Sequence, residues 1–196
     1  MAADVLTFDQ LNEIIAMPPS QVMDAAANLA KSGNPGTAVT ILKQAYDRHP
    51  TRIDLLIYAG RLQYRRGLLA EAGHIFRTAL IQKPGDVKAQ NGLALALRDS
   101  GEPRCIAEAE RLFRMTLKTK PDSIVARNGL AMLLLDSGEA RSIAAAERLF
   151  RKTLQHNPDD DVARTGLAML LSAHGEPARP APMRIDISRP EGPRSG

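Results

Sequence analysis

The chain has 196 residues, of which 44% are hydrophobic, and this is enough for one domain with a continuous buried core. Trp is absent and only 4% of the residues are aromatic, so Leu and Ala must do most of the packing. The net charge of +4 does not demand nucleic acid, and the single cysteine, Cys105, excludes an internal disulfide.

The first predicted element is a short helix that begins after Thr7, whose hydroxyl can cap it. Four apolar residues recur at the helical period and form one stripe: Phe8, Leu11, Ile14 and Ile15. Pro18 and Pro19 end this element. We therefore interpret residues 1–18 as a cap on the domain that follows, with an oligomer contact as the alternative.

Residues 53–86 contain two helical patterns separated by a turn. Small and apolar residues such as Ala59 recur at helical spacing before Gly67, and a glycine favours a helix end because it tolerates a positive φ. A second pattern around Phe76 continues until Pro84, and a proline cannot continue a helix. The segment predicts a pair of helices joined by a tight turn.

The same pattern recurs along the chain with a period of 34 to 37 residues. The recurring residues include Pro50, Pro84, Pro121 and Pro158, and also Phe76, Phe113 and Phe150. About two-thirds of the positions in 104–140 are identical to those in 141–177. A period in this range indicates stacked repeats, which usually act by presenting a surface.

The unit at 53–86 resembles the tetratricopeptide repeat. That family favours small, glycine, aromatic and proline residues at six positions, which are occupied here by Gly60, Gly67, Ala72, Phe76, Ala79 and Pro84. The resemblance implies an all-α, right-handed solenoid of stacked antiparallel helix pairs over residues 19–176. Its units are about 19–52, 53–86, 87–123 and 124–160, followed by a terminal helix at 161–174.

The units at 87–123 and 124–160 are three residues longer than the family's usual repeat. The extra residues follow Gly101 and Gly138, and because three residues make nearly one helical turn, a longer connection or a longer second helix can absorb them. Other positions also depart from the family pattern: Gln90, Arg127 and Arg164 replace a large residue, and Thr116 and Thr153 replace alanine.

Residues 177–196 are rich in Pro, Arg and Gly and predict a flexible tail. Within the tail, Met183–Ser188 alternates apolar and polar residues, so a segment that docks on the array or on a partner is the alternative. Prolines in the tail forbid a second helix after 161–174. The apolar surface of that helix predicts self-association or contact with a partner.

The resemblance also implies where a partner binds. In this family the first helix of each unit lines a concave groove, through residues that share one helical face. We predict a site for a peptide or partner subunit at Arg61, Tyr64, Arg65, Lys88, Asn91, Leu95, Arg98, Asn128, Met132 and Leu135. The alternative is that these residues only tile a solvent-facing surface. A Lys/Asn clamp for acidic C-termini is not expected, since only Lys88 stands at a matching place.

Patterns that carry chemistry are not found in the sequence. No Gly-rich phosphate loop follows a strand, and Cys105 has Ser142 as its counterpart in the next repeat. Four histidines lack metal-ligand spacing: His49, His74, His156 and His174. We therefore expect no catalytic activity, no metal and no cofactor.

The longest apolar run, 129–135, is too short to span a bilayer, and no basic segment followed by an apolar run opens the chain. These features favour a cytoplasmic protein.

The leading hypothesis is a non-catalytic module that binds proteins, acting as a bacterial assembly factor, chaperone or scaffold. Its partner would be a protein or peptide with acidic and apolar groups. One alternative is RNA binding, although basic residues do not recur in every unit and the recurring aromatics are core residues. The other alternative is a regulatory subunit of an enzyme complex.

Overall fold

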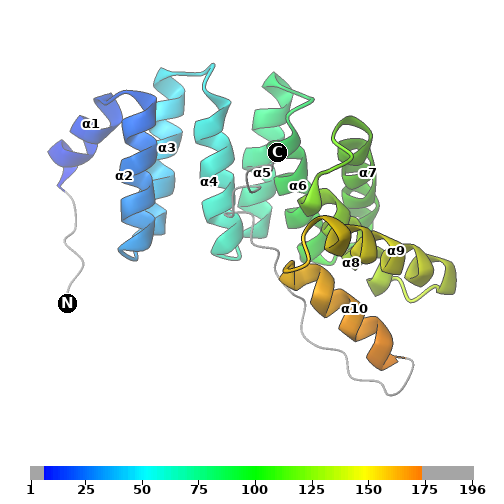
Figure 1. Ribbon diagram of the computed structural model, residues 1–196. Coiled ribbons are helices and arrows are strands. Elements are labelled where there is room, and N and C mark those ends of the chain that lie inside the picture. Colours follow the sequence, from blue (N-terminus) through cyan, green and yellow to red (C-terminus); the bar gives the residue numbers. More distant parts are fainter. Residues whose placement is uncertain (1–6, 174–196) are drawn as a thin grey trace. The chain divides into compact units, whose positions relative to one another are not determined.

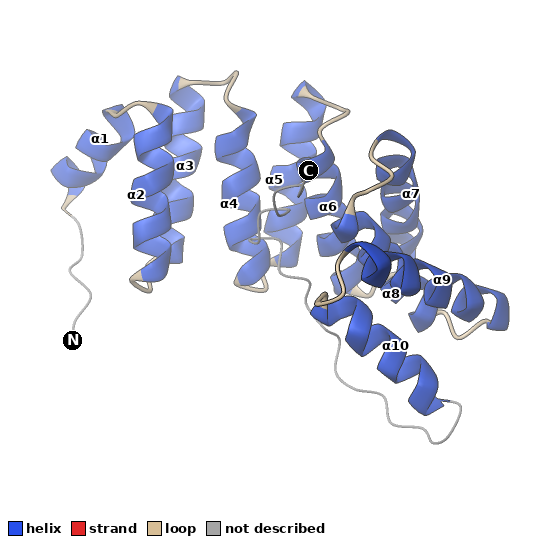
Figure 2. Cartoon of the chain, in the orientation of Figure 1, coloured by secondary structure: helices blue, strands red, loops and turns tan. Residues whose placement is uncertain are grey.

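The computed structural model describes residues 7–173, and every regular element in that range is an α-helix (Figure 2), which confirms the all-α fold class. The helices are α1 (Phe8–Ala16), α2 (Pro19–Lys31), α3 (Pro35–Arg48), α4 (Ile53–Arg65), α5 (Leu69–Gln82), α6 (Val87–Ser100), α7 (Pro103–Thr119), α8 (Ile124–Asp136), α9 (Ala140–His156) and α10 (Asp161–Ala173). The chain divides into two compact units, 1–96 and 97–196, with the boundary inside α6. The predicted tail, 177–196, lies outside the described residues.

Helix α1 begins at the predicted cap. The Thr7 hydroxyl accepts a hydrogen bond from the Gln10 backbone N–H at 3.3 Å, and the Gln10 side chain accepts one from the Thr7 N–H at 2.8 Å. This reciprocal pair satisfies two backbone donors that a helix start would otherwise leave open. The helix contacts α2 and α3 and buries Ile15, while Phe8 remains 77% exposed.

Unit 1 contains two helix pairs, α2 with α3 and α4 with α5, which lie side by side (Figure 1). The two helices of each pair are joined at a glycine with positive φ, Gly33 at 88° and Gly67 at 79°. A side chain at such a φ is strained, which explains glycine there. The first helices α2 and α4 also contact each other, so within unit 1 these two first helices lie next to one another.

Unit 2 repeats this arrangement. Helix α8 packs on α7 and α9, and α10 packs on α9 and α8 (Figure 1). The turn glycines Gly101 and Gly138 again have positive φ, at 71° and 72°. Helices α7 and α9 have 17 residues each, whereas α5 has 14. Because α5, α7 and α9 each begin two residues after the turn glycine, the three extra residues lengthen the second helix and not the connection.

The recurring phenylalanines are fully buried, and each lies against a glycine of the following repeat. A Cβ added to Gly92 would lie 2.4 Å from the ring of Phe76, and one added to Gly129 would lie 2.3 Å from the ring of Phe113. Gly166 stands in the same relation to Phe150, also at 2.3 Å. No side chain fits at that distance, so glycine there is a packing requirement.

Gln90 and Arg127, which stand where the family prefers another large residue, each donate a hydrogen bond to the carbonyl of a preceding proline. Gln90 donates a hydrogen bond to the carbonyl oxygen of Pro84, and Arg127 donates one to the carbonyl oxygen of Pro121, both at 2.8 Å. Arg127 is only 2% exposed, and among residues 7–173 its Nη1 has no hydrogen-bond partner. Burial lowers the pKa of the Arg127 guanidinium, because a low-dielectric environment disfavours its charge.

Candidate partner-binding surface

The predicted site residues differ strongly in exposure. Arg65 and Lys88 are exposed, and Arg61 and Leu135 are half-buried. The remaining six are at most 8% exposed: Tyr64, Asn91, Leu95, Arg98, Asn128 and Met132. The predicted site residues that are open to solvent are therefore mainly the cationic ones of α4 and the start of α6.

Arg61 and Arg65 are four residues apart on α4 and so share a helical face. The guanidinium carbon of Arg61 lies 6.0 Å from the centre of the Tyr58 ring, a distance at which a cation is attracted to an aromatic face. Tyr58 is half-buried and was not among the predicted residues. Its spacing of three residues from Arg61 is the sequence signal that could have found it.

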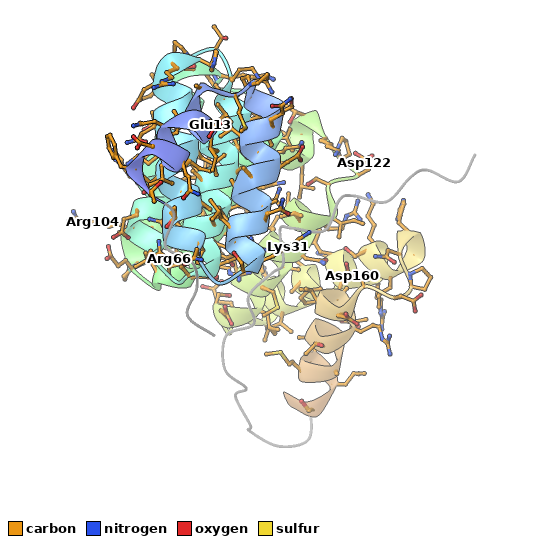
Figure 3. All side chains as sticks on the ribbon, turned by 90° about the vertical axis from the view of Figure 1, so that its left-hand side faces the viewer. Glu13, Lys31, Arg66, Arg104, Asp122 and Asp160 are labelled. Atoms are coloured by element: carbon orange, nitrogen blue, oxygen red, sulfur yellow. The ribbon has the colours of Figure 1, made fainter. Side chains whose placement is uncertain are left out.

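Asn128 is part of a buried chain of hydrogen bonds within unit 2. Its Oδ1 accepts from the Thr153 hydroxyl at 2.9 Å, and its Nδ2 donates to Asp160 Oδ1 at 2.7 Å. The same Asp160 oxygen accepts from the Ala163 backbone N–H at 2.8 Å. Asp160 lies at the start of α10 (Figure 3). These bonds connect α8, α9 and the first turn of α10, and so give Asn128 a structural role.

Arg98 forms an ion pair with its neighbour Asp99. Its Nε and Nη2 lie 2.8 Å and 2.6 Å from Asp99 Oδ1, and the two side chains are 6% and 9% exposed. Because the partner charge is this close, the cation is largely neutralised before any ligand arrives.

A cavity of about 310 Å³ in unit 2 lies beside this pair, between α7, α8 and α9. Its charged lining residues are Arg98, Glu110, Asp136 and Glu139. Since three of these four are carboxylates, the lining of the cavity is negatively charged. The face of α4 that carries Arg61 and Arg65 in unit 1 is positively charged.

The described residues, 7–173, contain neither a cluster of metal ligands nor a membrane-spanning helix. In that part of the chain no three His, Cys, Asp or Glu side chains gather as metal ligands. Between residues 7 and 173, each helix is too short or too polar to cross a membrane.

Residues 29–96 match the family model of the tetratricopeptide repeat. That stretch of the chain is therefore similar to tetratricopeptide repeats. No curated protein matches it. Among solved structures, it is similar to a tetratricopeptide repeat protein from Parabacteroides merdae, with 23% identity, a TM-score of 0.64 and coverage of 80% of this chain and 60% of that one.

Two further structures show the same likeness. A thermophilic TPR protein of Thermus thermophilus has 17% identity and a TM-score of 0.66, with 81% of this chain and 84% of that one covered. Pseudomonas aeruginosa PilF has 17% identity and a TM-score of 0.67, with 84% and 70% covered. At these identities the likeness establishes the fold alone.

Proposed function

We propose that this protein binds a segment of a partner protein along the first helices of its repeats, as an assembly factor, chaperone or scaffold of bacterial type. The observation that carries the proposal is the placement of three cations, Arg61, Arg65 and Lys88, on the first helices α4 and α6. Arg65 and Lys88 are exposed, and Arg61 is half-buried.

The chemistry of this surface favours a segment that carries carboxylates. A guanidinium binds a carboxylate through paired, charge-assisted hydrogen bonds, and the Tyr58 ring supports Arg61 from one side. In unit 2, half-buried Leu135 offers an apolar contact for the same class of ligand. We propose that the six buried residues of the predicted site have a structural role, each in packing its own helix.

The proposal is tested by capture of partners from a bacterial lysate, followed by mass spectrometry. The test variant carries Arg61→Glu, Arg65→Glu and Lys88→Glu. A charge-matched control carries three reversals at exposed cations of second helices: Lys43→Glu, Arg111→Glu and Arg148→Glu. We expect the control to retain the partners of the wild-type chain and the test variant to lose them, with unchanged circular dichroism in both.

Two outcomes would contradict the proposal. If the test variant captures the same proteins as the control, the cations of α4 and α6 are not the site. If nuclease treatment abolishes capture, and binding falls steeply with salt, the ligand is RNA, since release of phosphate counterions gives a steep slope.

A further inference from the structure

Helices α8 and α10 have nearly the same sequence in different surroundings. Nine of their 13 positions are identical, including Leu134 in α8 and its counterpart Leu171 in α10. Leu134 is half-buried, whereas Leu171 is 70% exposed. Likewise Ala131 is fully buried, and its counterpart Ala168 is exposed. The difference defines an open face of α10, made of Ala168 and Leu171.

The other repeats show what covers this face. In the repeat of α4 and α5, the residue equivalent to Ala168 is Gly60, and a Cβ there would lie 2.8 Å from the Phe76 ring of α5. In the repeat of α8 and α9, Ala131 packs in one cluster with Phe150 of α9. In the other repeats this position therefore faces the aromatic residue of the second helix of the same repeat, whereas within residues 7–173 no second helix follows α10.

The second helices that perform this role share one pattern. Each has an alanine followed four residues later by phenylalanine, both fully buried: Ala72 and Phe76 in α5, Ala109 and Phe113 in α7, and Ala146 and Phe150 in α9. We infer that the open face of α10 is a docking site for an amphipathic helix of a partner protein with a small residue and, four positions on, an aromatic one. That helix completes the last repeat.

Two other occupants fit less well. The sequence after α10 has prolines at 177, 180 and 182, a spacing that a helix interior does not accept. A second copy of this chain has its own α7 and α9 engaged in its own repeats.

The protein supplies its own probe for the test. A labelled peptide with the sequence of α9, Ala140–His156, is titrated against the full chain and followed by fluorescence anisotropy. We expect saturable binding that weakens at least tenfold when the peptide carries Phe150→Ala. Leu171→Asp in the protein abolishes binding, whereas Ile81→Asp, at an equally exposed apolar residue of α5, leaves it unchanged.

A tethered variant removes the dependence on peptide helicity. Residues 175–176 repeat the Gly-Glu sequence of 138–139, so replacing 177–193 by the α9 sequence places a second helix in register. The melting temperature should rise by about 5 °C, since the added helix buries the face of Leu171. In the background of Leu171→Asp the rise should be lost.

Three results would overturn the inference. The first is equal peptide binding by the Leu171→Asp protein, or no peptide binding together with no gain in melting temperature for the tethered variant. The second is a dimer in light scattering that Leu171→Asp dissociates, which identifies a second copy as the occupant. The third is peptide binding only after truncation at Glu176, which identifies the chain's own C-terminal segment.

Discussion

Replacing a glycine by alanine within a helix normally stabilises the helix. At Gly129 the same change should destabilise the protein, because Phe113 packs directly against this glycine. Gly129→Ala would place a Cβ 2.3 Å from the tip of a fully buried ring, and carbon atoms in contact lie about 3.5–4.0 Å apart. The ring must therefore retreat by more than about 1 Å inside a packed core, which costs about 3 kcal/mol. The higher helix propensity of alanine offsets about 1 kcal/mol of this cost, so we expect the free energy of unfolding to fall by about 2 kcal/mol.

The matched control is Gly73→Ala in α5, which is also a buried glycine within a helix. The nearest atom to its new Cβ is 3.7 Å away, an ordinary contact, so this change should stabilise the protein by up to about 1 kcal/mol. Urea unfolding followed by far-ultraviolet circular dichroism measures both. The reasoning is refuted if Gly129→Ala also raises the midpoint. It is supported further if Phe113→Leu lessens the loss in the Gly129→Ala background.

Two other substitutions test buried polar groups in unit 2 by the same measurement. Asn128→Ala should lower the free energy of unfolding by about 1–3 kcal/mol, because Thr153 and Asp160 each lose a hydrogen-bond partner at a site where Asn128 is 1% exposed. A change under about 0.5 kcal/mol would show that these hydrogen bonds do not contribute to stability. Arg127→Gln should be neutral or stabilising by up to about 2 kcal/mol, because it removes a buried charge and Gln90 makes the equivalent bond to a proline carbonyl. A clear loss would mean that the charge of Arg127 has a partner in solution.

The helices and their boundaries were largely predictable, because local residues determine them. Gly67 and Gly138 mark turns that require positive φ, and Thr7 caps α1 through contacts three residues away. The fate of the three extra residues was not predictable. A longer turn and a longer helix both satisfy the sequence pattern, and only packing along the length of α7 and α9 decides between them.

The exposure of the candidate site residues was less predictable, because exposure depends on contacts between residues far apart in the chain. Asn128 lies on the face expected to meet a ligand, yet its amide bonds to Thr153 and Asp160, which are 25 and 32 positions away. Thr153 stands where the family prefers alanine, and this departure is the sequence feature that could have predicted the buried hydrogen bonds of Asn128. The exposure of Arg65 follows from its place on a helix face, because a long cationic side chain carries its charge toward solvent.

The pairing of each phenylalanine with a glycine bears on how such a chain can evolve. In all three cases the glycine follows the phenylalanine by 16 positions, so the two residues that pack together are encoded within one short stretch of the gene. A duplication in steps of 37 residues copies both parts together, and the new repeat arrives already matched to its neighbours on each side. The array can therefore gain or lose a repeat in a single genetic event, with no compensating mutation at the new junction.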